Sequence, residues 1–133
     1  MAGNKFGAKK VTDPFTGEKF DSKAEYHRWC ELKLLERAGK ISGLHRQVTF
    51  ELIPSQREKS AEVYKAGPQK GLPKPGAVIE KPVKYVADFV YEDEHGKLVV
   101  EDAKGLKKGA AYELFVIKRK LMLYVHGIRI HEV

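Results

Sequence analysis

The chain has 133 residues, a formal net charge of +7, 42% hydrophobic residues and 10% aromatic residues. This length fits a single domain, and this hydrophobic share favours a packed core over a disordered chain. No run approaches the roughly 18 apolar residues of a membrane-spanning helix. The N-terminus also lacks the apolar segment of a signal peptide. The positive charge favours a polyanionic partner, usually nucleic acid, although a merely soluble basic protein is the plainer alternative.

Cysteine usage indicates the compartment. Cys30 is the only cysteine, so the chain cannot form an intrachain disulfide. A reducing compartment, the cytoplasm, is therefore expected. Because Cys30 falls within a predicted helix, we expect it to be a small buried side chain.

The first elements are short. Residues 1–10 are predicted to form a flexible basic arm, and the Asp-Pro-Phe-Thr-Gly sequence at 13–17 predicts a turn. Further along, alternation of apolar and polar residues over 47–53 predicts a strand, which ends at Pro54.

A helix is predicted between the turn and this strand. Ser22 and Glu25 fit the spacing of a capping box, and good helix formers continue to Ala38. Gly39 is the expected C-terminal cap. Three apolar residues recur at helical spacing and are expected to face the core: Trp29, Leu32 and Leu35.

The segment 55–82 is rich in proline and lysine and is predicted to be a long, mostly irregular loop or flap. A short extended piece is expected at 77–80. Lysines in this loop and in the arm are candidates to contact a phosphate backbone without reading sequence. They are Lys5, Lys9, Lys10, Lys59, Lys65, Lys70, Lys74, Lys81 and Lys84.

The C-terminal half predicts two strands at 84–91 and 97–103, then a helix at 110–125 and a short strand at 128–133. The helix has an apolar stripe, interrupted by charged residues, of Leu114, Ile117, Leu121 and Val125. With no repeat and no second domain, residues 1–133 are predicted to be one α/β domain.

The two C-terminal strands each contain an acidic residue within an apolar run. Alternation places Asp102 and Lys104 on one face of the second strand. A three-residue loop of Glu94, His95 and Gly96 would set Asp88 opposite Asp102, with their Cβ atoms about 5 Å apart. Two facing carboxylates repel each other unless a cation lies between them, and Mg²⁺ prefers such oxygen ligands. A plainer alternative is a structural ion pair of Asp102 with Lys104 on a solvated edge.

Asp88, followed by Asp102-Ala103-Lys104, resembles the metal-binding hairpin of the PD-(D/E)XK nuclease superfamily. Further stretches look like a family of small phage-encoded proteins of endonuclease type, similar to Holliday-junction resolvases. They are Lys-Phe-Gly-Ala-Lys-Lys at 5–10, Phe-Asp-Ser-Lys-Ala-Glu at 20–25, the helix at 31–41, Gln47, and the two acidic strands. The resemblance covers most of the chain except the proline- and lysine-rich loop.

The resemblance implies a restriction-endonuclease-like core, with a mixed central sheet flanked by helices. It implies that Asp88, Asp102 and the Ala103 carbonyl bind Mg²⁺, with Mn²⁺ able to substitute. Glu25, from the first helix, would complete the site, although a capping box alone explains this residue. Lys104 would orient the attacking water or contact the phosphate.

This chain departs from the superfamily pattern at one position, and a neighbouring acid offers a second candidate ligand. Ala87, rather than proline, precedes Asp88. Glu101 adjoins Asp102, and only Asp102 shares a face with Lys104 unless a bulge twists the strand.

The sequence thus predicts a Mg²⁺-dependent DNA endonuclease, phage-derived and acting in the host cytoplasm. Selectivity for branched or recombination DNA, rather than for sequence, is the first expectation. Because small nucleases of this kind often dimerise to cut two strands, a homodimer is one assembly that the resemblance allows. The alternatives are a non-catalytic DNA-binding or assembly protein with the same fold, and a protein-binding module with an incidental basic surface.

Overall fold

The computed structural model describes residues 10–105 and 107–133. It divides the chain into two compact units. The first comprises the described residues up to Phe50 together with Val86–Val133, and the second comprises Glu51–Tyr85. The predicted basic arm lies outside the described residues except for Lys10, which is exposed. Within the described part of the chain, no helix is both long and apolar enough to cross a membrane.

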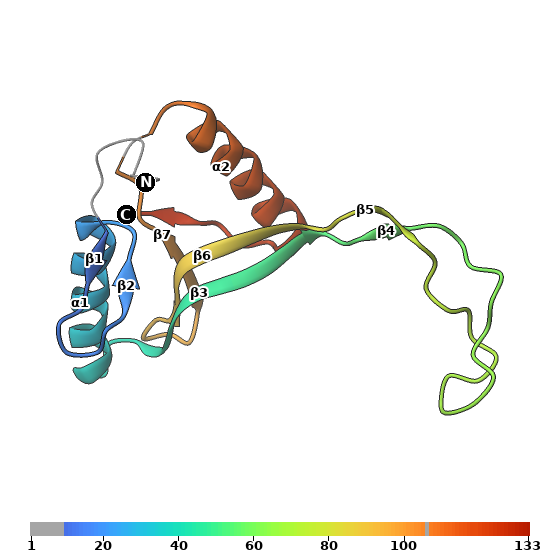
Figure 1. Ribbon diagram of the computed structural model, residues 1–133. Helices are drawn as coiled ribbons and strands as arrows, with labels where there is room; N and C mark the ends of the chain where they lie inside the picture. The colour runs from blue at the N-terminus through green and yellow to red at the C-terminus, as the bar shows by residue number, and fades with distance from the viewer. Residues whose placement is uncertain (1–9, 106) are drawn as a thin grey trace. The chain divides into compact units, whose positions relative to one another are not determined.

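The elements follow one another along the chain as Figure 1 shows. Before the second unit come β1 (Val11–Thr12), β2 (Lys19–Phe20), α1 (Lys23–Arg37) and β3 (Ser42–Ile53). Next are β4 (Gln56–Arg57), β5 (Val78–Glu80), β6 (Val83–Glu92) and β7 (Leu98–Asp102). The chain ends with α2 (Ala110–Leu121), η1 (Met122–His126, a π-helical turn) and β8 (His131–Glu132). β3 thus begins earlier than predicted, and β8 is shorter.

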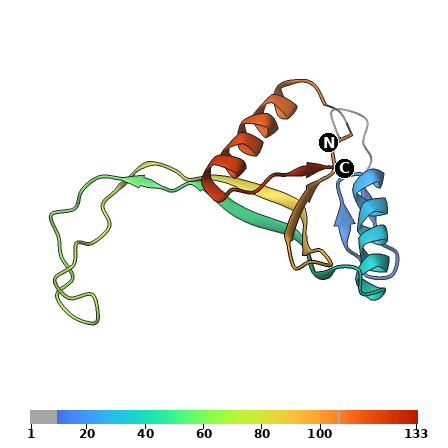
Figure 2. The ribbon, with the colours of Figure 1, turned by 180° about the vertical axis from the view of Figure 1, so that it is seen from behind.

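A four-stranded mixed sheet has the strand order β3-β6-β7-β8. β6 and β7 are antiparallel and joined by a short loop, whereas β7 and β8 are parallel. Parallel neighbours need a long crossover connection, which α2 and η1 provide. Figure 2 shows the helices α1 and α2 beside this sheet, seen from behind. The protein is therefore a mixed α/β protein with a mixed central sheet, as the sequence predicted.

The hairpin between β6 and β7 has the predicted loop. The Asp93 amide donates to the Lys97 carbonyl at 2.9 Å, and the Gly96 amide donates to the Asp93 carbonyl at 3.0 Å. Gly96 adopts a positive φ of 74°, the left-handed conformation that this loop requires. Phe89 consequently pairs with Glu101. The predicted register is confirmed.

The helix α1 has the predicted caps. The Ser22 hydroxyl accepts a hydrogen bond from the Glu25 amide at 3.1 Å, and Gly39 adopts a φ of 76° beyond the last turn. Leu32 is fully buried, whereas Leu35 is 37% exposed, so its predicted core position is wrong. The predicted burial of Cys30 is wrong as well, because this residue is exposed.

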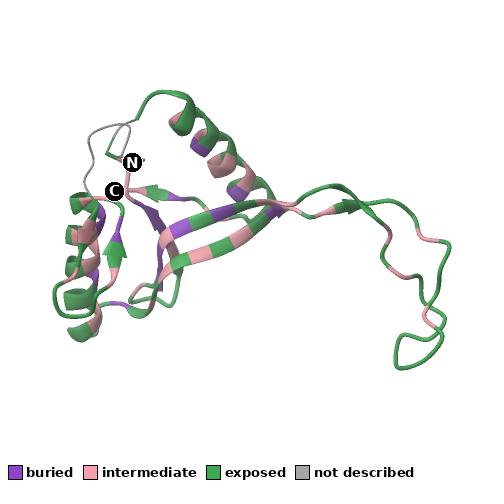
Figure 3. Cartoon of the chain, in the orientation of Figure 1, coloured by how far each residue is buried: buried purple, intermediate pink, exposed green. Residues whose placement is uncertain are grey.

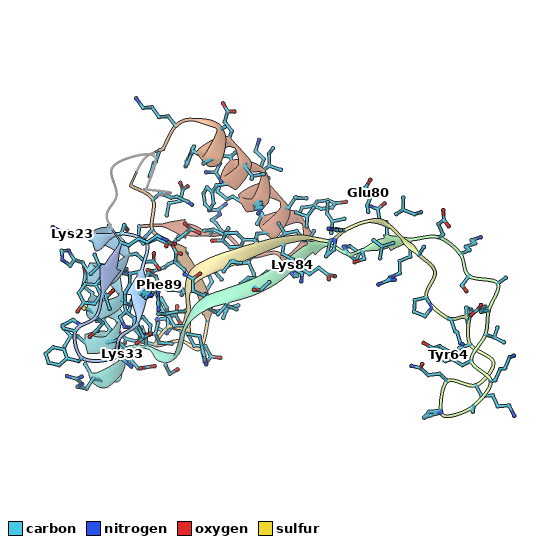
Figure 4. All side chains as sticks on the ribbon, in the orientation of Figure 1. Lys23, Lys33, Tyr64, Glu80, Lys84 and Phe89 are labelled. Atoms are coloured by element: carbon cyan, nitrogen blue, oxygen red, sulfur yellow. The ribbon has the colours of Figure 1, made fainter. Side chains whose placement is uncertain are left out.

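The helix packs on one face of the sheet. Trp29 stacks on Phe89 with ring centroids 6.1 Å apart, and Figure 4 labels Phe89 on β6. The buried cluster comprises Leu32, Ile41, Phe89 and Tyr91, with Trp29, Leu44 and Val99 packed against it. Since side chains alternate along β6 and β7, the opposite face is left for Val90, Val100 and the two predicted acids.

The side of α2 that is buried differs from the predicted one. Phe115 and Met122 are buried, with exposed fractions of 5% and 0%. Leu114 and Ile117, from the predicted apolar stripe, are 54% and 56% exposed. The helix thus has apolar residues on two sides, and periodicity alone does not distinguish which side packs on the sheet.

Between 55 and 82 the second unit is mostly irregular, as predicted, with two short strands. β4 and β5 form a two-stranded antiparallel sheet, which confirms the extended piece expected at 77–80. Further along the ribbon, Val63 pairs with Pro73, and the Tyr64 amide donates to the Leu72 carbonyl at 3.0 Å. Gly76 allows the two strands to approach, because a Cβ there would lie 2.0 Å from the Glu58 carbonyl oxygen.

Candidate functional site

Asp88 and Asp102 face each other across β6 and β7. The observed register ends with Phe89 opposite Glu101, and one further step places Asp88 opposite Asp102. The Ala103 amide donates to Asp88 Oδ2 at 2.8 Å, which ties the two strands together at this point. Asp102 is only 4% exposed. Two acids of the predicted site are therefore adjacent, with Asp102 buried and Asp88 half-buried.

This arrangement raises the pKa of Asp88 to about 7. Burial is the largest cause, followed by the negative charge of Asp102 and then that of Glu25. The hydrogen bond from Ala103 and the positive charge of Lys104 act in the opposite direction. Carboxylates in such a group hold a proton near neutral pH unless another cation replaces it.

Lys104 lies beside Asp102, as the alternation predicts. Its Nζ is 2.8 Å from Asp102 Oδ1 and 4.0 Å from the ring centroid of Phe115 on α2. The structural ion pair considered from sequence is thus present. However, Asp102 is buried and the Lys104 side chain is only 24% exposed, so the pair does not lie on a solvated edge.

Glu25 adjoins the site from the start of α1, and its side chain is 4% exposed. Its Oε2 accepts the Asp21 amide at 3.2 Å, so one oxygen serves the helix cap. Its Oε1 accepts from Arg46 Nη2 at 3.4 Å and from Gln47 Nε2 at 3.3 Å. Burial raises the pKa of Glu25 above its usual value. Glu25 therefore does cap the helix, through Oε2, while its Oε1 faces Arg46 and Gln47.

Gln47 connects Glu25 to Asp88. Its Nε2 also donates to Asp88 Oδ1 at 3.3 Å, so one amide group bridges two carboxylates from different elements. Gln47 has a φ of 52°, the one positive φ at a non-glycine residue in the described chain. A side chain in that conformation costs on the order of 1–3 kcal/mol, and such strain clusters at functional sites.

Glu101 is occupied elsewhere. Arg28 donates through Nε and Nη2 to its two carboxylate oxygens, each at 2.7 Å, and the Tyr91 hydroxyl donates to it as well. Glu101 is 2% exposed. Its hydrogen bond with Arg28 raises the pKa of the guanidinium, and burial together with Glu101 raises the pKa of Tyr91 to about 12. Glu101 therefore braces β7 against α1, on the face away from Lys104.

The donor set fits Mg²⁺ only in part. Among residues 10–105 and 107–133, no group of three or more His, Cys, Asp or Glu side chains has a geometry that could hold a metal ion. Asp88 and Asp102 nevertheless form the carboxylate pair that Mg²⁺ sites often use, with waters and substrate phosphate as the remaining ligands. The Ala103 carbonyl and Glu25 remain predicted ligands.

Two residues of this site were not identified by sequence reasoning. Arg46 lies with its guanidinium 3.7 Å from the Phe20 ring centroid and forms ion pairs with Glu18 and Glu25. Gln47 was noted only as part of a resemblance, and its bridging role depends on a backbone conformation with no sequence signal. Both follow a positive-φ glycine, Gly43, in the first half of β3.

The fold and site thus define a mixed α/β protein with a pair of carboxylates, one buried and one half-buried, next to a lysine. The chain belongs to the family described as "Protein of unknown function (DUF1064)", whose model matches residues 3–130. No curated protein and no solved structure matches it.

Proposed function

We propose that this protein is a Mg²⁺-dependent endodeoxyribonuclease with a restriction-endonuclease-like core of the PD-(D/E)XK type. The observation that carries this proposal is the pairing of the half-buried Asp88 with the buried Asp102, whose Oδ1 lies 2.8 Å from Lys104 Nζ. Burying two like charges side by side is costly, and a divalent cation removes that cost. If the site were purely structural, apolar residues at these positions would give a more stable fold.

In the proposed reaction, Asp88 and Asp102 hold the metal, with the Ala103 carbonyl and Glu25 as further ligands. When bound, Mg²⁺ supplies an acidified water and neutralises charge that develops on the phosphate; Mn²⁺ is expected to substitute. Lys104 orients that water or donates to the phosphate oxygens. Gln47 holds Glu25 and Asp88 in position through its amide.

The second unit is the proposed backbone-contacting element. It contains seven Lys and Arg residues against four Glu residues. Several of its apolar side chains are exposed as well, with Leu72 at 55% and Ile79 at 60%. Figure 4 labels Tyr64, Glu80 and Lys84 in this unit. A two-stranded ribbon without a core is marginal in water, and its width suits the DNA major groove. Branched DNA is the proposed substrate, in the cytoplasm of a phage host.

The test is a cleavage assay on supercoiled plasmid and on a four-way junction, with Mg²⁺ or Mn²⁺. Wild-type protein is expected to cut at least one substrate, and chelation by EDTA is expected to abolish cutting. Asp88→Ala should be inactive, whereas Glu92→Gln, an exposed acid on the same strand, should cut like wild type. Equal cutting by Asp88→Ala would exclude this site.

The second candidate is a non-catalytic DNA-binding or assembly protein with the same fold. The observation in its favour is the absence of a three-ligand cluster among the described residues. Binding of the junction without cleavage of either substrate, with either metal, would replace the enzyme proposal by this one.

A further inference from the structure

The helix α2 presents an apolar stripe on the side that does not pack on the sheet. Leu114, Ile117 and Leu121 recur at intervals of three and four residues. Leu114 and Ile117 are 54% and 56% exposed, and Tyr124, one further turn along in η1, is 88% exposed. In Figure 3 exposed residues alternate with intermediate and buried ones along this helix. The stripe is contiguous, because residues three or four apart are neighbours on a helix.

The stripe is separate from the core of the first unit. The core side of the helix is formed by Phe115 and Met122, which lie seven residues apart and are both buried. Val125 extends the exposed apolar surface into η1, with 45% exposed. Contiguous apolar surface of this kind on a folded unit marks an interaction site.

Two charged residues flank the same edge of the stripe. Glu113 precedes Leu114 in the first turn, and Lys120 precedes Leu121 in the last turn. They are therefore one heptad apart and lie on the same side. Neither forms an ion pair within the described part of the chain. If a second α2 lay antiparallel on the stripe, Glu113 would adjoin the partner's Lys120, and Lys120 would adjoin the partner's Glu113.

We propose that this stripe is a homodimer interface in which the two α2 helices pack antiparallel about a twofold axis near Ile117. The occupant is a second copy because the edge charges are complementary to themselves under that axis and the helix dipoles favour the antiparallel arrangement. A specific interface needs roughly 1,000 Å² of buried surface, and one pair of short helices offers little more. We therefore expect a weak dimer, with a Kd of about 1–100 μM. Its existence does not depend on the proposed nuclease activity.

The test is sedimentation equilibrium of the full chain from about 1 to 200 μM. Wild type is expected to shift from monomer to dimer across this range. Ile117→Asp should remain monomeric while keeping the wild-type thermal melt, since Ile117 is not in the core. Phe15→Asp is the matched control, because Phe15 is 94% exposed but lies in the turn before β2, and it should dimerise like wild type. A monomeric wild type, or a dimeric Ile117→Asp, would overturn the proposal and leave the stripe to another partner.

A charge exchange tests the antiparallel geometry and does not require a core substitution. Glu113→Lys and Lys120→Glu should each weaken dimerisation on the order of tenfold, because each replaces two attractive pairs by two repulsive pairs. The double variant Glu113→Lys with Lys120→Glu should recover the wild-type Kd. If the double variant is as weak as either single variant, the antiparallel pairing is wrong.

Discussion

Replacing Asp88 by asparagine should stabilise the metal-free protein at alkaline pH. Asp88 is half-buried opposite Asp102, and its pKa rises from 3.8 to about 7. Between these two pH values the folded protein retains a proton that the unfolded chain has released. Stability therefore falls as pH rises through this window and is constant above it. Asparagine keeps an oxygen that can accept from the Ala103 amide but has no charge.

The size of the effect follows from the shift. About three pKa units correspond to roughly 4 kcal/mol, and screening by the water that still reaches Asp88 reduces this to about 2–4 kcal/mol. The asparagine variant should gain that amount over wild type at pH 8 and almost nothing at pH 4.

Urea unfolding at pH 4, 6 and 8 in the presence of EDTA measures this difference. Glu92→Gln on the same strand is the control, and it should follow the pH dependence of wild type. If Asp88→Asn and wild type lose the same stability between pH 4 and pH 8, the argument that Asp88 is destabilised by burial and by Asp102 is refuted.

Three further predictions concern the site, its support and the second unit. At tenfold its Kd, Mg²⁺ should raise the unfolding free energy of wild type by about 1.4 kcal/mol at pH 8 but not that of Asp88→Asn, as measured by urea titration; equal gains would place the metal elsewhere. Arg28→Met should cost about 3–5 kcal/mol in the same assay, because it leaves the buried Glu101 with the Tyr91 hydroxyl but without its cationic partner; a cost below about 1 kcal/mol would show that Glu101 is not desolvated. The double change Lys65→Gln with Lys70→Gln should lower the slope of log affinity against log salt by about 1–2 in junction binding; an unchanged slope would show that the ribbon does not contact phosphates.

Much of the hairpin could be predicted because its determinants are local. The loop of Glu94, His95 and Gly96 fixes the register, and alternation then assigns each side chain to a face. Alternation assigns Asp102 and Glu101 to opposite faces of β7. The pairing of Glu101 with Arg28 on α1 is consistent with this assignment. The N-terminal cap of α1 at Ser22 could likewise be predicted, because it depends only on residues within one helical turn.

The errors share a different cause. The core side of α2 depends on which of two apolar faces meets the sheet, so Phe115 was missed and Leu114 was misplaced. Gln47 reaches two carboxylates only because β3 adopts an unusual backbone conformation at that point. Such long-range and strained features are set by tertiary packing, for which a single sequence has no periodic signal.

The central claim is tested most directly by the single-turnover cleavage rate of Lys104→Met on the substrate that wild type cuts, with Mg²⁺ saturating. Methionine keeps an unbranched side chain of similar length but has no ammonium group. We expect the rate to fall by about 10²–10³, with junction affinity within twofold of wild type. Lys108→Met, an exposed lysine in the same connection, should cleave like wild type. Wild-type cleavage by Lys104→Met would contradict a nuclease site built on Asp88, Asp102 and Lys104.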